Sequence, residues 1–269
     1  MTTFKEFERD AWERKASRYP DTWGTLTIQP IEAVLDAAKV CAKTELLDCG
    51  CGPGHLAYRA VERGAIVTGC DYSKAMLRIA NANYPKLNFH FEDAEALSFS
   101  GSSFDAVILN FLLLHVADQP RVLLEAKRVL KPMGRLVYSV WLPPAESPGL
   151  KLVFDAIAKY ADTSVIPPAQ DIFMFARADH AAEFLKLNGF SNIKFQRFET
   201  YWQVPTAEAF FSAVQAGTRM GGMIELQKPE IKVQIRQSID AALSNCQTLE
   251  GYIIPTPSII VSAQKESAN

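Results

Sequence analysis

Three aspartates and a run of glycines are the residues best suited to hold a ligand. Asp48 stands in "LLDCGCGPG", directly before three glycines on alternate positions. Asp71 follows 23 residues later and Asp93 another 22 residues on, each at the end of a short apolar run. Carboxylates accept hydrogen bonds from amines and hydroxyls, and glycines let the backbone turn sharply beneath a ligand. The pattern therefore indicates a binding loop with three acceptors around it.

The glycine loop fits more than one cofactor. The segment from Gly52 to Ala57 reads G-x-G-x-x-A, and Asp71 lies 19 residues past Gly52, near the spacing typical of dinucleotide binding. Asp48 argues against a pyrophosphate at this loop, because its carboxylate would repel phosphate and favour an ammonium group. A ligand with an α-amino group, a ribose and an adenine but no phosphate is S-adenosylmethionine. We expect this cofactor, and a nicotinamide-dependent oxidoreductase is the alternative.

The surrounding segments must bring these residues together. Between residues 45 and 141, apolar runs such as "ELLDCG", "AIVTGCD" and "FDAVILNF" alternate with helical patterns such as "HLAYRAVERG" and "KAMLRIANAN". Continuous apolar strands separated by helices predict a parallel sheet covered on both faces. Because the carboxyl ends of parallel strands meet at one edge, we expect the three aspartates to lie side by side there.

The remainder of the chain completes this sheet and adds helices. "SNIKFQRFETYWQV" predicts one long antiparallel strand near 191–204, and "YIIPTPSIIVSAQK" predicts the last strand, near 252–265. We expect an α/β fold, a doubly wound, mostly parallel seven-stranded sheet, in a single domain over 1–269 with its core at about 30–141. Two helical insertions, about 146–176 and 206–247, are expected to form a lid with an apolar substrate pocket walled by Phe111, Trp141 and Trp202.

Composition limits the partners. The 269 residues carry 28 basic and 30 acidic side chains, so no strong field attracts nucleic acid or an anionic membrane. No uncharged apolar run is long enough for a membrane span, and the mixed-charge N-terminus does not resemble a signal peptide. Five cysteines do not make a disulfide framework, which favours the cytoplasm.

The spacing of Cys49, Cys51 and Cys70 does not suit zinc, so we expect no metal. The sequence leaves the oligomeric state open.

Five motifs in order resemble the class I methyltransferases, specifically the small-molecule group related to the ubiquinone and menaquinone C-methyltransferases. These motifs are "LLDCGCGPG", "GCDYSKAML", "FEDAEALSF", "FDAVILNFLLLHV" and "LKPMGRLVYSVW". The N-terminal "WERKASRY" resembles the family's W-x-x-x-A-x-x-Y helix. The resemblance covers about residues 12–141. It implies a Rossmann-like methyltransferase fold and an S-adenosylmethionine-dependent enzyme that methylates a small, apolar or aromatic molecule.

The resemblance also implies roles for individual residues. It assigns Asp48 and the backbone at Gly50 and Gly52 to the methionine moiety, and Asp71 to the ribose hydroxyls. It assigns the other cofactor-binding residues to the surroundings of the adenine and the sulfonium. The cofactor-binding residues expected in this way are Tyr19, Asp48, Gly50, Cys51, Gly52, Asp71, Tyr72, Met76, Asp93, Ala94, Asn110, Phe111 and His115.

The sequence departs from the family after the fourth strand. The family often has two histidines there, whereas this chain has Leu114 at the first position and only His115 at the second. His115 is the candidate for a catalytic role, with a structural role as the alternative. No other residue indicates a general base, and the atom that is methylated, oxygen, nitrogen or carbon, stays open. A protein that binds the cofactor without turnover is the second alternative.

Overall fold

The computed structural model describes residues 2–267. Its helices are α1 (Phe4–Lys15), α2 (Gly24–Thr27), α3 (Ile31–Ala37), α4 (His55–Glu62), α5 (Lys74–Asn83), α6 (Gln119–Val129), α7 (Pro148–Tyr160), α8 (Ala178–Leu187), α9 (Ala207–Ala216), α10 (Arg219–Glu225) and α11 (Pro229–Leu243). Its strands are β1 (Glu45–Cys49), β2 (Ile66–Asp71), β3 (Asn88–Phe91), β4 (Phe104–Asn110), β5 (Leu130–Trp141), β6 (Phe190–Phe198), β7 (Tyr201–Val204), β8 (Gln247–Thr248), β9 (Gly251–Pro255) and β10 (Ser258–Lys265).

Seven strands form the main sheet in the order β3-β2-β1-β4-β5-β10-β6. The first five strands of the chain run parallel, and β10 runs antiparallel to both β5 and β6. The predicted fold class, a doubly wound and mostly parallel seven-stranded sheet, is confirmed. The strand order reverses between β1 and β4, and the crevice outside the carboxyl ends of these strands is where such sheets bind ligands.

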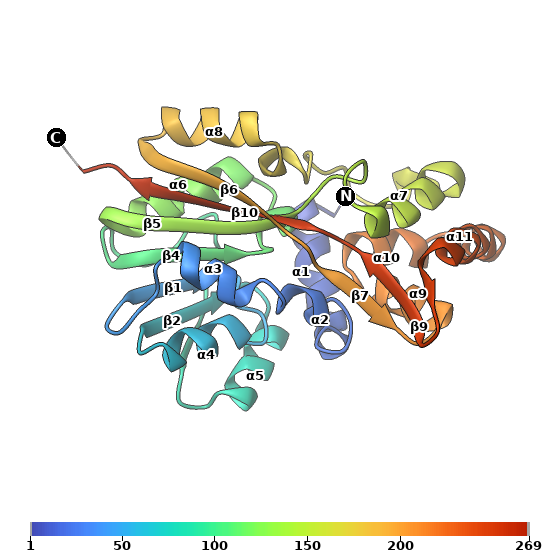
Figure 1. Cartoon of the computed structure of the whole chain (residues 1–269), viewed down its shortest axis with the longest axis horizontal. Coiled ribbons are helices and arrows are strands. Elements are labelled where there is room, and N and C mark those ends of the chain that lie inside the picture. Colours follow the sequence, from blue (N-terminus) through green and yellow to red (C-terminus); the bar gives the residue numbers. More distant parts are fainter. Residues whose placement is uncertain (1, 268–269) are drawn as a thin grey trace.

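Helices cover both faces of this sheet (Figure 1). The neighbouring residues Leu46 and Leu47 of β1 are both fully buried, yet they belong to different apolar clusters on opposite faces. Helices α6 and α8 complete one cluster, and α3 and α4 complete the other. This explains why the central strands are apolar throughout rather than alternating.

The two long C-terminal strands predicted as single strands each divide into two. The first strand is interrupted between β6 and β7, and the second between β9 and β10. Strands β7, β9 and β8 form a separate three-stranded sheet. At the break, the amide of Thr256 donates to the carbonyl of Thr200 at 2.8 Å, and the Thr200 hydroxyl donates back to the Thr256 carbonyl. Pro255 and Pro257 flank Thr256 and have no amide hydrogen for a ladder, which accounts for the division between β9 and β10.

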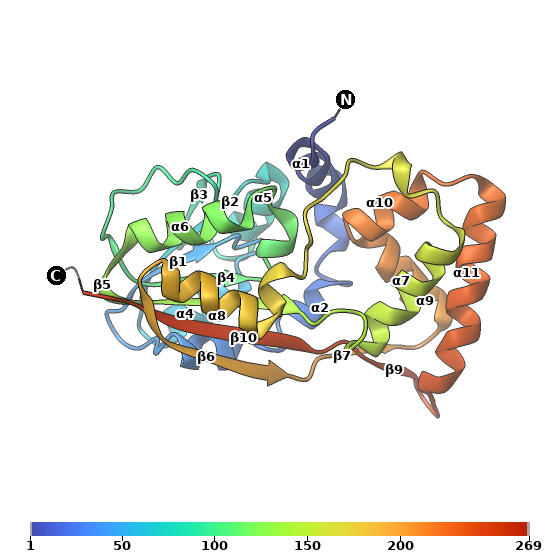
Figure 2. The same ribbon diagram turned by 90° about the horizontal axis from the view of Figure 1, so that it is seen from above.

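The helices of the two insertions gather at one end of the molecule. Figure 2 shows α7, α9, α10 and α11 together beyond the end of the main sheet, with α1 between them and the sheet. Their apolar side chains share one cluster with Trp23, with Phe111 directly after β4 and with Trp141 at the end of β5. The insertions therefore pack onto the sheet's carboxyl edge. No helix among residues 2–267 has the length and apolarity that crossing a membrane requires.

Candidate active site

The glycine loop follows β1 and turns in the left-handed region. Gly50, Gly52 and Gly54 have φ values of 76°, 50° and 86°. A Cβ atom at Gly50 or Gly54 would come within 2.8 Å of the side chains of Leu112 and Phe89, respectively. At Gly52 a Cβ atom would meet no atom within 4 Å, so this glycine faces open space. The loop thus presents its backbone at Gly52 to a cavity.

Asp71 ends β2 and closes the loop from the side. Its Oδ2 accepts a hydrogen bond from the Gly52 amide at 2.9 Å, and its Oδ1 accepts one from the Ser73 amide at 2.8 Å. Burial raises the pKa of Asp71, while these backbone hydrogen bonds lower it. Ser73 also caps the start of α5, because its hydroxyl accepts from the Met76 amide at 3.2 Å. Each carboxylate oxygen of Asp71 has further acceptor capacity.

Asp48 lies beneath the loop and is 1% exposed. Neither of its carboxylate oxygens has a hydrogen-bond partner among the described residues. Burial raises the pKa of Asp48 to about 7, the Asp71 charge adds to this, and the nearby backbone amide of Ala57, which does not reach hydrogen-bond geometry, opposes it. A buried carboxylate without a donor is costly, which makes this position suited to a cationic or donating group.

Ten of the predicted cofactor-binding residues line one cavity. They are Tyr19, Gly50, Gly52, Asp71, Tyr72, Met76, Ala94, Asn110, Phe111 and His115. Asp48 and Cys51 do not line it, because the side chains of both are buried. Asp93 does not line it either. Its carboxylate forms an ion pair with Lys5 of α1 and accepts a hydrogen bond from the Glu95 amide at 3.0 Å.

Helix α1 lines the cavity and forms hydrogen bonds with the elements on both sides of it. On the sheet side, Glu13 accepts hydrogen bonds from the Ser73 hydroxyl at 3.0 Å and the Ala75 amide at 3.1 Å. On the insertion side, the Lys15 ammonium donates to the carbonyls of Gln215 and Gly217 at 2.8 and 3.0 Å. The resemblance implied a helix over residues 12–19, whereas α1 spans Phe4–Lys15, and the contacts of its charged residues with both sides of the cavity were not predicted.

The aromatic residues of the N-terminal motif, Trp12 and Tyr19, both line the cavity. The Trp12 ring meets the edges of Tyr19 and His115, with centroids 5.4 and 4.9 Å apart. The Tyr19 hydroxyl shares a hydrogen bond of 2.7 Å with Thr27, and burial raises its pKa to about 12. Tyr19 therefore stays neutral and contributes a rigid aromatic wall.

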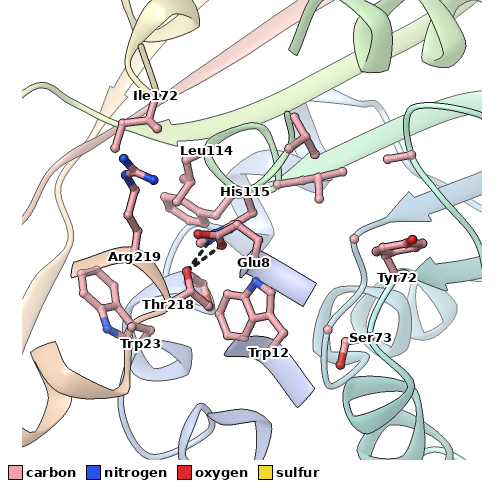
Figure 3. A pocket seen from close by; sticks show the side chains of 18 of the residues that line it. Glu8, Trp12, Trp23, Tyr72, Ser73, Leu114, His115, Ile172, Thr218 and Arg219 are labelled. Atoms are coloured by element: carbon pink, nitrogen blue, oxygen red, sulfur yellow. Dashed lines mark hydrogen bonds and ion pairs between the residues drawn. The ribbon is translucent and has the colours of Figure 1, made fainter. Parts of the chain in front are cut away.

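A polar cluster occupies the cavity next to His115. The Glu8 carboxylate, 3% exposed, lies 2.8 Å from His115 Nδ1 and accepts a hydrogen bond of 2.7 Å from the Thr218 hydroxyl. Figure 3 shows Glu8, His115 and Thr218 converging, with dashed lines for the contacts of Thr218. Glu8 and Thr218 were not predicted. They lie 210 residues apart, and nothing in either local pattern points to the other.

Apolar side chains form the remaining wall. Phe111 stacks on Trp141 with ring centroids 4.0 Å apart, and both line the cavity as predicted. Trp202, also predicted as a wall, does not line it and packs against Trp23 instead, at 5.1 Å. The two insertions supply the rest of this wall. Their lining residues are Leu150, Phe154, Ile157, Ile172, Phe173, Met220 and Met223. Within residues 2–267 no group of three or more potential metal ligands is clustered.

Comparison with known proteins identifies the family. A family model described as a methyltransferase domain matches residues 47–138. The demethylmenaquinone methyltransferase of Paenarthrobacter aurescens is 30% identical over 173 residues, which cover 61% of this chain and 68% of that protein. A ubiquinone biosynthesis O-methyltransferase of Coxiella burnetii is 29% identical over 144 residues, which cover 52% of this chain and 60% of that protein.

Solved structures with the same fold include other methyltransferases. The YcgJ protein of Bacillus subtilis superposes with a TM-score of 0.63 at 20% identity, covering 90% of this chain and all of that one (100%). The Haemonchus contortus phosphoethanolamine N-methyltransferase 2, in complex with S-adenosylhomocysteine, superposes with a TM-score of 0.63 at 17% identity, covering 99% of this chain and 61% of that one. Sequence relatives and fold agree: the chain belongs to the class I S-adenosylmethionine-dependent methyltransferases and is an enzyme that uses this cofactor.

Proposed function

We propose that the enzyme methylates a small, apolar or aromatic molecule whose acceptor atom must lose a proton, a hydroxyl or an acidic carbon. The observation that carries this is the position of His115. One cavity joins the Gly52 loop and Asp71 on one side to the apolar insertion residues on the other, and His115 lines it together with both. The names of the sequence relatives, which refer to menaquinone and ubiquinone, support an aromatic acceptor.

The cofactor side is suited to S-adenosylmethionine in three respects. The unpartnered Asp48 carboxylate favours an ammonium group, the open space at Gly52 accommodates a ligand, and Asp71 retains acceptor capacity for hydroxyls. We assign the methionine moiety to Asp48 and the loop, the ribose to Asp71, and the adenine to Tyr72, Met76 and Ala94. Cys51 and Asp93 would support these positions from behind. When bound, the cofactor supplies an electrophilic methyl group on a sulfonium.

The contact with Glu8 at Nδ1 leaves Nε2 as the nitrogen of His115 that can accept a proton. If the Glu8 carboxylate accepts from His115 Nδ1–H, the lone pair of the imidazole is on Nε2. A proton leaving the substrate's acceptor atom would then pass to Nε2, and the resulting imidazolium would be stabilised by Glu8. The acceptor atom would exchange its proton for the methyl group, with a neutral thioether as the leaving group, so the positive charge of the sulfonium would be matched by that of the imidazolium. An amine or thiol acceptor would need such a base less.

The experiment separates binding from turnover. Purified protein is incubated with a metabolite extract and S-adenosylmethionine carrying a deuterated methyl group, and mass spectrometry detects labelled products. Calorimetry with S-adenosylhomocysteine measures cofactor binding in parallel. We expect tight binding and a labelled, apolar product. Binding without any labelled product would favour the non-catalytic alternative.

The role of the histidine has its own test. His115→Ala and Glu8→Gln should lower kcat by about 10²–10⁴-fold, with the acidic limb of the pH–rate profile altered and S-adenosylhomocysteine affinity unchanged. His55→Ala is the control, because His55 contacts Tyr84 at 2.8 Å and does not line the cavity. Unchanged kcat in His115→Ala would exclude the proposed base.

A further inference from the structure

Arg219 is a cation in an otherwise apolar part of the cavity. It is half-buried and lines the cavity beside Ile172, Phe173 and Met220. Figure 3 shows its guanidinium directed toward Ile172, on the opposite side of the cavity from Tyr72 and Ser73. The side chain therefore lies in the substrate region and away from the glycine loop.

The partners of Arg219 leave its guanidinium without an ion pair among residues 2–267. One guanidinium nitrogen donates to the carbonyl of Pro167 at 3.1 Å, and the group lies over the Phe4 ring at 5.5 Å. Lys5 and Arg9, the other lysine and arginine that line the cavity, have carboxylates at 2.5–3.1 Å, whereas Arg219 has none within 4.0 Å among residues 2–267. A guanidinium has five N–H donors, so most of them remain for a ligand.

The charge of Glu8 acts on Arg219 but forms no ion pair with it. Its Oε2 already contacts His115 and Thr218, and no ion pair joins Glu8 to Arg219 within 4.0 Å. The negative charge of Glu8 also disfavours a doubly charged ligand in this region. A single carboxylate matches the planar donor pair of one guanidinium and adds one charge only.

We propose that Arg219 binds a carboxylate on the substrate, so that the enzyme acts on an apolar or aromatic acid rather than on a neutral molecule. The inference rests on the proposed function, because it places the carboxylate at the end of the same cavity in which His115 faces the acceptor atom. Ile172, Phe173 and Met220 would then contact the apolar body of the substrate near its acidic end.

The test uses a matched pair of probes that differ only in charge. A hydroxynaphthoate and the corresponding hydroxynaphthamide are titrated into protein saturated with S-adenosylhomocysteine, and calorimetry gives both affinities. We expect the wild-type protein to bind the acid roughly tenfold or more tightly than the amide, as a charge-assisted bidentate contact provides. Arg219→Met should remove this preference, and Arg219→Lys should keep part of it.

The controls distinguish the possible failures. Arg14→Met changes an exposed arginine of α1 and should keep the preference for the acid. If the wild-type protein binds acid and amide alike, or binds neither, the assignment is overturned, and this comparison needs no variant to fold. An unchanged preference in Arg219→Met would show that Arg219 serves only as a counter-charge for Glu8. Failure of the wild-type protein to bind S-adenosylhomocysteine would instead contradict the proposed cofactor site.

Discussion

Asp48 is an unusual residue because it combines deep burial with an acidic group and no donor. Its pKa of about 7 lies above the ordinary value of 3.8, so the folded protein binds more protons than the unfolded chain between about pH 4 and 7. The contribution of this group to stability is therefore present in acid and is lost as the pH rises through 7. A cationic ligand would reverse this by favouring the ionised form.

We predict that S-adenosylhomocysteine binds more weakly below pH 7, by up to about tenfold per pH unit, because Asp48 must lose its proton on binding. Calorimetry at about pH 5.5 and 7.5 measures this. Asp48→Asn should abolish the difference between the two pH values and weaken binding at the higher one. An equal pH slope in the variant would mean that Asp48 does not face the ammonium group.

Asp71 provides the second residue-scale prediction. Asp71→Ala should weaken S-adenosylhomocysteine binding by about 1.5–3 kcal/mol, the range for hydrogen bonds to a charged group. Asp36→Ala, at an exposed carboxylate of α3 that pairs with Arg63, is the control and should bind normally. Unchanged calorimetric affinity in Asp71→Ala would remove its assignment to the ribose.

Gly52 and Gly64 form a matched pair for the third prediction. Both have positive φ, 50° and 82°, but only Gly52 faces the cavity. Gly52→Val should abolish cofactor binding while the protein stays folded, because the side chain would enter the ligand's space. Gly64→Ala should lower stability, since its Cβ would meet Ala42 at 3.2 Å, and leave binding unchanged. Thermal unfolding and calorimetry distinguish the two effects.

At the scale of elements, the insertion helices carry aromatic residues of two kinds, those that line the cavity and those that pack in the core. Phe154 of α7 lines the cavity, whereas Phe211 of α9 is 7% exposed, lies in the apolar cluster and packs under the Arg236 guanidinium at 4.9 Å. The sequence did not distinguish them, because both are aromatic residues in amphipathic helices. Only their positions in the fold show that Phe154 can contact a substrate and that Phe211 packs in the core.

We predict that Phe154→Ala lowers substrate affinity and leaves cofactor affinity and stability nearly unchanged. Phe211→Ala should instead lower the free energy of unfolding by about 3–5 kcal/mol, the range for removing a buried phenylalanine. Denaturant unfolding and KM measurements check the pair. If Phe154→Ala binds substrate normally, the insertion does not wall the substrate site.

At the scale of the whole molecule, α1 connects the sheet to the insertions. Its Glu13 contacts the start of α5, its Glu8 and Lys15 contact Thr218 and Gly217, and its residues line the cavity between them. Ligand binding at the glycine loop should therefore restrain segments that are distant in sequence. A ligand present at a concentration of a hundred times its Kd stabilises a folded protein by about 2.7 kcal/mol.

We predict that S-adenosylhomocysteine slows amide hydrogen exchange in α1 and α10 as well as in residues 46–76. Mass spectrometry of peptic fragments measures this, and α8, which packs in the same apolar cluster as α6 and does not line the cavity, serves as the reference segment. Protection confined to residues 46–76 would show that α1 and the insertions do not respond to the cofactor, and that they are not a lid over it.

Local patterns in the sequence determined the sheet, the glycine loop and the aspartates at the strand ends. Alternating strand and helix periods need only neighbouring residues, as the Ser73 cap and the left-handed glycines show. Single strands near 191–204 and 252–265 were wrong, because the paired threonines Thr200 and Thr256 meet only in the fold. The domain boundaries and the roles of the lining residues stay predictions.

Tertiary structure alone decided the polar part of the site. Glu8 comes from the first helix, His115 follows the fourth strand, and Thr218 and Arg219 lie at the start of α10. No periodicity relates these positions, since side chains that meet across a cavity are set by how whole elements pack. The sequence therefore determined which cofactor the protein uses, and the packing of α1 and the insertions determined what stands opposite it.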